Sequence, residues 1–190
     1  MGGRGLMRLL VAALPQEITA FPAELPGFEV LVTGLGKLQA AVGLSERLRD
    51  GAYEEVVVVG TAGGLVPTAE GTVHEVATAI QHDVADLDGV VGRHVALPER
   101  TGSGEGVVIA TGDRFIDDAD AVAEITALGA TLVDMETYAY FWVAERYGVP
   151  IRVFKAVSDP AQDGATQLWD EVVATCSEWL RERIRTEYGV

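Results

Sequence analysis

Cysteine is almost absent from this chain of 190 residues, which contains only Cys176. A single cysteine cannot form an internal disulfide, and no group of Cys and His residues has the spacing of a zinc site. Long apolar runs are also lacking, since a membrane-spanning helix needs about 20 such residues. The apolar run after Arg8 is too short for a signal peptide and is expected to form a first strand. We therefore expect a protein of the reducing cytoplasm that has no membrane partner.

Basic residues are scarce as well. The chain has 14 Lys and Arg against 29 Asp and Glu, and its formal net charge is -15. A field of this sign repels polyanions, so we expect no nucleic-acid partner. Hydrophobic residues make up 48% of the chain and charged residues 23%, which is near the globular average and excludes a disordered chain. The length predicts a single domain that spans residues 1–190.

What the chain has in quantity is apolar, β-branched runs. They cover residues 8–14, 28–34, 56–60, 73–80, 106–112, 131–136 and 151–159. Because these runs are nearly continuous rather than alternating, they indicate strands that are covered on both faces. Helical patterns lie between them, at residues 37–49, 118–128, 136–147 and 165–188. The alternation predicts an α/β fold, a three-layer α/β/α sandwich around a central mixed, largely parallel twisted sheet.

Glycine marks the connections. Gly51, Gly148 and Gly189 stand where three of the predicted helices would end. The glycine-rich segment 83–106 has weaker periodicity and is predicted to be a long loop.

Two glycine motifs resemble nucleotide-binding loops without matching them. VTGLGKLQ, at 32–39, has Gln39 where a dinucleotide fingerprint requires glycine, and Leu38 where a P-loop requires Ser or Thr. We therefore interpret it as a strand that turns into a helix through Gly34 and Gly36. GTAGGL, at 60–65, follows four valines. Its backbone N–H groups could receive a polar ligand or a water molecule, and a simple tight turn fits equally well.

Three carboxylates, Glu17, Glu136 and Asp159, each lie at or just past the C-terminal end of a predicted strand. Ligands of open α/β sheets bind at this edge. Each acid alone could be a helix N-cap or a solvated turn residue. Together, and with GTAGGL at the same edge, they favour a ligand site.

Seven short segments carry a resemblance to a known family. They are ALPQEI (13–18), GLGK (34–37), GTAGGL (60–65), HDVAD (82–86), TGDRFI (111–116), DMETYA (134–139) and KAVSD (155–159). In this order they resemble the purine nucleoside phosphorylase and nucleosidase superfamily, and within it most closely the 5'-methylthioadenosine/S-adenosylhomocysteine nucleosidases. The resemblance runs from residue 8 to about residue 165, and Met-Glu followed by Ser-Asp is its most specific part.

The resemblance implies hydrolysis of the N-glycosidic bond of a 5'-modified purine nucleoside, giving adenine and a substituted ribose. It implies a homodimer, with no metal and no organic cofactor. Asp159 would be the general acid near purine N7, a role that suits a partly buried carboxyl able to hold a proton near neutrality. Alternatively, Ser158 and Asp159 cap the following turn. Glu17 would hold and activate the attacking water.

The substrate-binding residues also follow from the resemblance. Glu136 would accept hydrogen bonds from the two ribose hydroxyls. Met135 would pack on the sugar, although a methionine at this place could equally fill the core. Phe115 would stack on the purine and Ile116 would present backbone groups to its edge. The remaining members of the expected set are Thr61, Ser158 and Lys155.

Three positions distinguish alternatives within the superfamily. Val58 stands where phosphorylases carry an arginine, so water rather than phosphate is the expected nucleophile. Lys155 replaces the usual arginine of the nucleosidases, keeping the charge but losing the planar fork that would meet ribose or water. Arg114 replaces a small residue and is either a surface residue or a partner for an anionic group of the substrate, as in futalosine-type nucleosides.

Three other functions therefore stay open: a futalosine or aminofutalosine hydrolase, a phosphate-dependent purine nucleoside phosphorylase, and a nucleoside-binding module without catalysis. The chain is shorter than most relatives around residues 86–106. In the family this region helps a neighbouring subunit to close over the 5' substituent of the substrate, so the 5' specificity is left undetermined.

Overall fold

The computed structural model describes residues 7–67, 71–90, 100–102, 106–161 and 165–190. Its strands are β1 (Met7–Ala12), β2 (Phe28–Val32), β3 (Tyr53–Gly64), β4 (Val73–Gln81), β5 (Arg100–Thr101), β6 (Val107–Thr111), β7 (Leu132–Asp134) and β8 (Ile151–Asp159). Its helices are α1 (Lys37–Asp50), α2 (Ala119–Ala127), α3 (Thr137–Tyr147), α4 (Ala165–Tyr188) and the short 3-10 helix η1 (Pro15–Ile18). Every strand and helix that the sequence predicts is present. The predicted loop 83–106 lies partly outside the described residues and contains β5.

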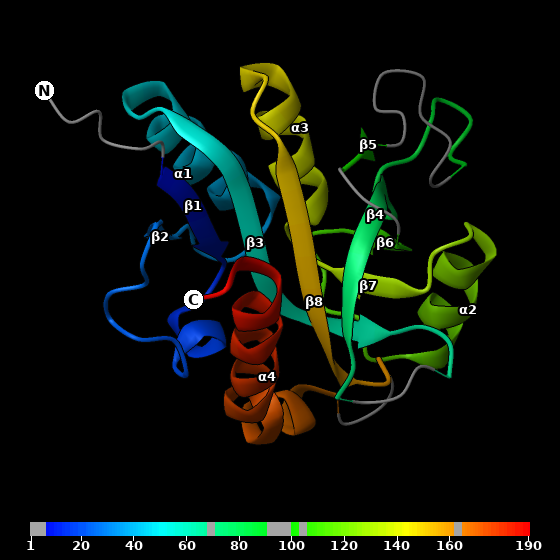
Figure 1. Ribbon diagram of the computed structural model, residues 1–190. Coiled ribbons are helices and arrows are strands. Elements are labelled where there is room, and N and C mark those ends of the chain that lie inside the picture. Colours follow the sequence, from blue (N-terminus) through cyan, green and yellow to red (C-terminus); the bar gives the residue numbers. More distant parts are fainter. Residues whose placement is uncertain (1–6, 68–70, 91–99, 103–105, 162–164) are drawn as a thin grey trace, which may run out of the picture.

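The sheet is mixed and mostly parallel, which confirms the predicted α/β sandwich. Strands β2, β1, β3 and β8 lie side by side in this order and run parallel to one another. Strand β4 lies antiparallel to β8, and β6 and β7 follow it, each parallel to the strand before it. The last of these strands, β7, pairs antiparallel with the C-terminal end of β3. Figure 1 shows β3 bending toward β7 at this end. The pairing therefore returns to β3, and the C-terminal ends of β3, β7 and β8 come together.

The first five residues of the GTAGGL motif are part of β3, so the tight-turn alternative is wrong. The strand continues through it to Gly64 and pairs Gly63 with Val133 of β7. A Cβ on Gly63 would lie 3.1 Å from the side chains of both Val133 and Ala161. A side chain at this position would crowd both neighbours, because β7 and the residues after β8 approach β3 closely.

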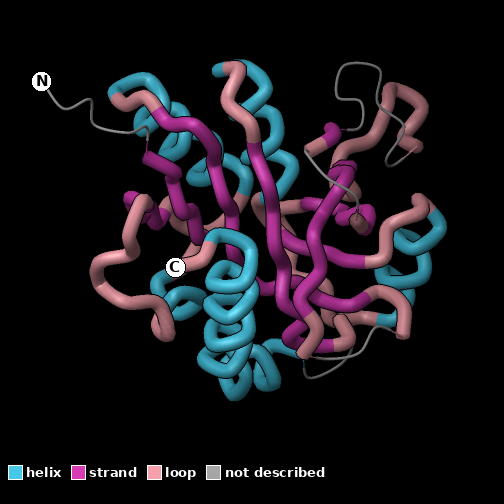
Figure 2. Tube along the Cα trace, in the orientation of Figure 1, coloured by secondary structure: helices cyan, strands magenta, loops and turns pink. Residues whose placement is uncertain are grey.

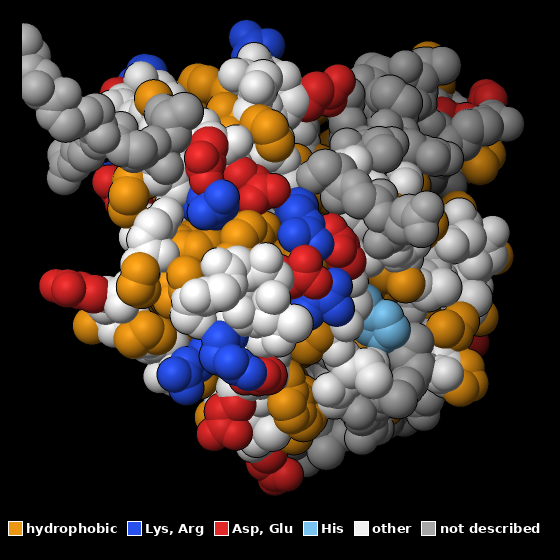
Figure 3. Space-filling model, viewed as in Figure 1, with side chains coloured by type: hydrophobic (Ala, Val, Ile, Leu, Met, Phe, Trp, Pro, Cys, Tyr) orange, Lys and Arg blue, Asp and Glu red, His pale blue; other side chains and the backbone are white. Residues whose placement is uncertain are grey.

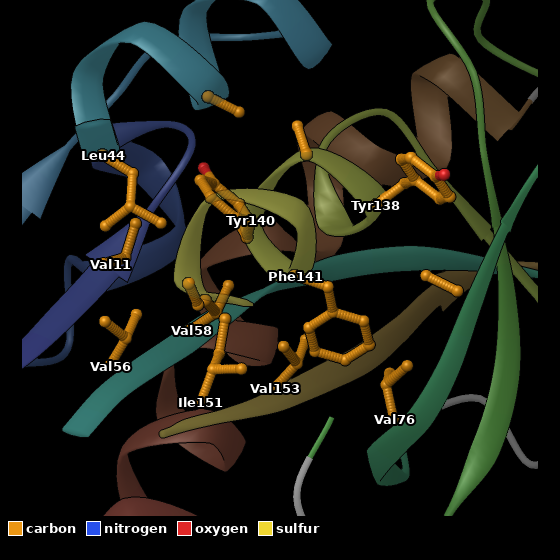
Figure 4. Close-up of a cluster of buried hydrophobic side chains, with 14 of the residues drawn as sticks. Val11, Leu44, Val56, Val58, Val76, Tyr138, Tyr140, Phe141, Ile151 and Val153 are labelled. Carbon is orange, nitrogen blue, oxygen red and sulfur yellow. The ribbon is translucent and has the colours of Figure 1, made fainter. Parts of the chain in front are cut away.

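Helices cover both faces of the sheet, as Figure 2 shows, because successive strand residues point to opposite sides. On one face Val56 and Val58 of β3 pack against α1 and α3, and on the other Val57 and Val59 pack against α4. Figure 4 shows the first cluster, in which Phe141 of α3 lies over the strands. Among the described residues, no helix combines the length and hydropathy needed to cross a membrane.

Glycine directs the chain from β2 into α1, as the sequence predicts. Gly34 and Gly36 have φ values of +99° and +89°, which side chains other than glycine rarely adopt. The helix ends predicted at Gly51 and Gly148 are also confirmed, and Gly148 is left-handed with φ +66°. The turn at Gly36 matters for the site, because it brings a backbone N–H group next to the start of α3.

Ion pairs connect the C-terminal part of α4 to the strands. Figure 3 shows acidic and basic side chains next to one another over α4 and the adjoining strands. Arg152 of β8 pairs with Glu75 of β4 at 2.7 Å and with Glu187 of α4 at 3.0 Å. Arg183 of α4 pairs with the same two carboxylates. This network fixes the C-terminal part of α4 against β4 and β8, while its N-terminal part reaches the other end of the sheet.

Candidate active site

A cavity of about 330 Å³ lies where β1, β3, β7 and β8 end, within the size range of small-molecule sites. All three predicted carboxylates line it. The walls are formed by Ala13, Leu14, Glu17, Leu35, Thr61, Ala62, Gly63, Arg114, Phe115, Ile116, Val133, Asp134, Met135, Glu136, Ser158, Asp159 and Trp169. The structure thus brings together every residue of the expected site except Lys155.

Glu17 is buried in η1 and its carboxylate is held by four hydrogen bonds. Its Oε1 accepts from the backbone N–H of Thr61 at 2.8 Å and from the Thr61 hydroxyl at 3.0 Å. Its Oε2 accepts from the N–H groups of Ala13 and Leu14, both at 3.1 Å. Four donors match the acceptor capacity of an ionised carboxylate. The arrangement places a fixed negative charge on the cavity wall.

Lys155 lies behind the cavity rather than on its wall, which corrects the expectation that it contacts the substrate directly. Its side chain is 1% exposed, and its Nζ pairs with Asp134 Oδ2 at 3.0 Å. Burial alone would lower the pKa of Lys155, but Asp134, Glu136 and Glu17 outweigh it and raise the pKa to about 12. The ammonium group therefore stays charged and compensates the carboxylates around it.

Asp134 was not among the expected site residues, although it begins the DMETYA segment. Its Oδ1 accepts from the Thr111 hydroxyl at 2.7 Å, and its Oδ2 accepts from the backbone N–H of Thr137 at 3.0 Å as well as pairing with Lys155. These partners hold the Asp134 side chain in one position. Asp134 thereby anchors Lys155 in the middle of the acidic cluster.

Glu136 lies at the start of α3 on the cavity wall, next to Met135. Its Oε1 accepts from the Gly36 N–H at 2.8 Å, which the glycine turn after β2 positions. Burial raises the pKa of Glu136 to about 8; Asp134 adds to this effect and Lys155 opposes it. This raised pKa favours the protonated form of the carboxyl at neutral pH.

Ser158 and Asp159 end β8 and combine the two alternatives that the sequence left open. The Ser158 hydroxyl donates to Asp159 Oδ2 at 2.7 Å, and the Ala161 N–H donates to Asp159 Oδ1 at 2.8 Å. Asp159 thus closes the turn after β8. It also lines the cavity, so its capping contact and a position next to a ligand coexist.

Three consecutive residues after β6 form another part of the cavity wall. Ile116 is buried, whereas Phe115 is 40% exposed and offers a ring surface at the cavity. Arg114 lines the cavity and also pairs with Asp118, the N-cap residue of α2. Both alternatives for Arg114 therefore stay open, because the side chain is a surface ion pair and a cavity residue at once.

Trp169 of α4 lines the cavity and was not identified from the sequence. Its indole N–H donates to the Thr61 hydroxyl at 2.8 Å. The apolar pattern of residues 165–188 predicts the helix, but it does not say which side chain reaches the end of β3. Only the packing of α4 against η1 and β3 shows that.

The chain is 27% identical over 172 residues to a 5'-methylthioadenosine/S-adenosylhomocysteine nucleosidase of an Exiguobacterium species, covering 78% of this chain and 74% of that protein. The family model described as "Phosphorylase superfamily" matches residues 103–185, which carry the TGDRFI, DMETYA and KAVSD segments. Part of the chain thus matches the superfamily model, and the nucleosidase relative is similar over most of the chain. The resemblance that the sequence motifs indicate is thereby confirmed.

Solved structures of a nucleosidase and of a futalosine hydrolase share the fold. A 5'-methylthioadenosine/S-adenosylhomocysteine nucleosidase of Neisseria meningitidis, in complex with methylthio-immucillin-A, is 25% identical with a TM-score of 0.82, covering 94% of this chain and 96% of that chain. A futalosine hydrolase mutant of Helicobacter pylori is 19% identical with a TM-score of 0.86, covering 95% and 97%. The predicted nucleoside phosphorylase-like fold is therefore confirmed.

The buried charge of Lys155 is expected to contribute to the stability of the fold. The variant Lys155→Met leaves Asp134 and its neighbouring carboxylates uncompensated, and we expect it to lower the free energy of unfolding by about 3–5 kcal/mol. The matched variant Lys155→Arg keeps the charge and should lose less. Urea unfolding at neutral pH measures both. A Lys155→Met protein as stable as the wild type would contradict this account of the cluster.

Proposed function

We propose that the chain hydrolyses the N-glycosidic bond of a 5'-modified adenosine of the methylthioadenosine and S-adenosylhomocysteine type, releasing adenine and a substituted ribose. The observation that carries this proposal is the convergence of Glu17, Glu136 and Asp159 on a single cavity. The named activity of the similar nucleosidases supports it.

In the proposed reaction the bond between the anomeric carbon and purine N9 breaks while a water oxygen bonds to the same carbon. Asp159 gives its proton to N7 of the departing purine, so that the base does not leave as an anion. Glu17 takes a proton from the water. Glu136 accepts hydrogen bonds from the ribose hydroxyls, which strengthen as the sugar gains positive charge. Phe115, Ile116 and Met135 provide the apolar surfaces for base and sugar.

The charges around the cavity favour water over phosphate as the nucleophile. Arg114 is the one basic residue among the described cavity-lining residues, and it is paired with Asp118. Lys155 is paired with Asp134, and Val58 is buried in the core. A phosphate dianion would therefore meet carboxylates, and Arg114 would have to leave Asp118 to hold it.

Arg114 favours a second candidate, hydrolysis of a futalosine-type nucleoside that carries a carboxylate. Its guanidinium group lies at the cavity and could exchange Asp118 for a substrate carboxylate. We rank this candidate second, because the likeness to a futalosine hydrolase structure at 19% identity concerns the fold alone.

We propose that the protein works in the cytoplasm without a metal or an organic cofactor. The reaction needs only water, an acid and a base. Among the described residues, no three His, Cys, Asp or Glu side chains are arranged to hold a metal ion. The free Cys176 is buried, and burial raises the pKa of its thiol to about 11, so it is a poor thiolate nucleophile.

We also propose a homodimer. Leu35, Leu38 and Val42 expose apolar side chains at the start of α1, Leu38 being 76% exposed, and Leu35 also lines the cavity. A second copy would cover this surface beside the cavity. Sedimentation equilibrium is expected to give twice the chain mass, and Leu38→Asp should shift the protein toward the monomer. A wild-type monomer at micromolar concentration would contradict the proposal.

The activity is tested by base release from methylthioadenosine, S-adenosylhomocysteine, adenosine, inosine and futalosine, measured by chromatography without phosphate. We expect adenine to be released fastest from the two thio-substrates. Hypoxanthine released from futalosine alone, and lost in Arg114→Ala, would favour the second candidate. Binding of a nucleoside without any base release would leave only a binding module.

The general acid is tested by Asp159→Asn. Asparagine keeps the size of the side chain but cannot donate an acidic proton, so base release should fall about a hundredfold or more. The Ala161 N–H can still donate to the asparagine oxygen, so the fold should be retained, which circular dichroism would verify. Near-normal turnover by a folded Asp159→Asn protein would refute this role.

Glu136 gives binding a pH dependence. The pKa of Glu136 is raised to about 8. Ribose hydroxyls that donate to this carboxylate favour its ionised form, so binding should lower the pKa and release a proton. Affinity is therefore expected to rise with pH up to about 8 and then level off. Calorimetry in buffers of different ionisation enthalpy measures the proton release. The same release in Glu136→Gln would contradict the assignment.

A further inference from the structure

We propose that Trp169 is a positioning residue for Glu17, because its indole N–H group fixes the direction of the Thr61 hydroxyl proton. This inference rests on the proposed function, in which Glu17 is the base. It adds a residue of α4 to the machinery that holds that base.

The direction of the hydrogen bonds follows from the chemistry of the three groups. An indole N–H can only donate, so at 2.8 Å the Thr61 Oγ1 must accept from Trp169. The hydroxyl has one proton of its own, and Glu17 Oε1 lies 3.0 Å away. An ionised carboxylate can only accept, so this proton points to Glu17. The indole and the carboxylate thus define both ends of a chain through one hydroxyl, whose bonds strengthen each other.

The Thr61 hydroxyl is the adjustable donor among those around Glu17. The other three are backbone N–H groups, of Ala13, Leu14 and Thr61, which β3 and the chain entering η1 hold in place. A hydroxyl can rotate about its C–O bond, and without Trp169 it could donate elsewhere. Trp169 therefore determines whether Glu17 keeps its fourth donor.

The packing of α4 supports this role. The helix packs on both η1 and β3, the elements that carry Glu17 and Thr61. Farther along α4, the Ser177 Oγ accepts from the backbone N–H of Ala20, just after η1, at 3.0 Å. Helix α4 therefore holds the segment that carries Glu17, and it also provides the Trp169 N–H group that orients the Thr61 hydroxyl.

The kinetic test is the pH dependence of kcat and KM for Trp169→Phe, Thr61→Val and the double variant. Phenylalanine keeps an aromatic ring but loses the N–H. Losing a donor to an anion disfavours the charged form, so the acid limb of the pH–rate profile should move to higher pH. We expect a shift of about one pH unit in Thr61→Val and about half of that in Trp169→Phe, with a larger effect on kcat than on KM.

The double variant separates positioning from bulk. If Trp169 acts through the hydroxyl, adding Trp169→Phe to Thr61→Val should move the acid limb no further. The control is Trp142→Phe on α3, which makes the same chemical change away from the cavity lining and should leave the profile at its wild-type position. An unmoved limb in Trp169→Phe, or a KM effect that adds to that of Thr61→Val, would overturn the inference.

A second readout does not depend on turnover. The indole N–H resonance of Trp169, assigned by its loss in Trp169→Phe, should titrate together with Glu17 in ¹⁵N-labelled protein and stop doing so in Glu17→Gln and in Thr61→Val. A wild-type protein that releases no base but shows this titration would refute the proposed function and leave the hydrogen-bond chain standing. A resonance that is insensitive to Glu17→Gln would refute the inference itself.

Discussion

The site depends on the attraction between the buried ammonium group of Lys155 and the carboxylates around it. Asp134, Glu136 and Glu17 surround it, and each raises its pKa. Like charges this close could not all ionise in a poorly solvated place without an opposite charge among them. With Lys155 in place, Asp134 is paired at 3.0 Å, Glu17 is held by four donors, and Glu136, whose pKa is raised to about 8, is the member of the cluster that we propose to change its charge on binding.

The fold delivers these groups through close backbone contacts. A Cβ on Gly60 would lie 2.9 Å from Lys155 Nζ and 3.0 Å from Glu17 Oε1, so glycine at this point of β3 leaves the room that the two charged groups occupy. Gly63 does the same for β7 and the turn after Asp159. Because β3 bends to pair with β7, the ends of β7 and β8 meet on one cavity, and the apolar faces of the sheet stay free for the helices.

Much of this could be predicted from the sequence. Continuous apolar runs predict strands covered on both faces, and acids at their ends predict a site at one edge. The remainder depends on tertiary contacts that local patterns do not encode. GTAGGL has the composition of a turn, yet pairing with β7 extends it as strand. Lys155 was expected at the substrate, but Asp134 holds it behind the cavity. Trp169 belongs to a helix whose orientation only packing decides.

We propose that this acidic cavity directs water, not phosphate, to the anomeric carbon. The most direct measurement is the mass of the sugar product formed from methylthioadenosine in the presence of excess phosphate. If water is the nucleophile, we expect the product to be free methylthioribose, formed at a rate that phosphate does not change. A sugar 1-phosphate as the product would contradict this proposal, because a phosphate dianion would then be bound among carboxylates, with Arg114 drawn away from Asp118 to hold it.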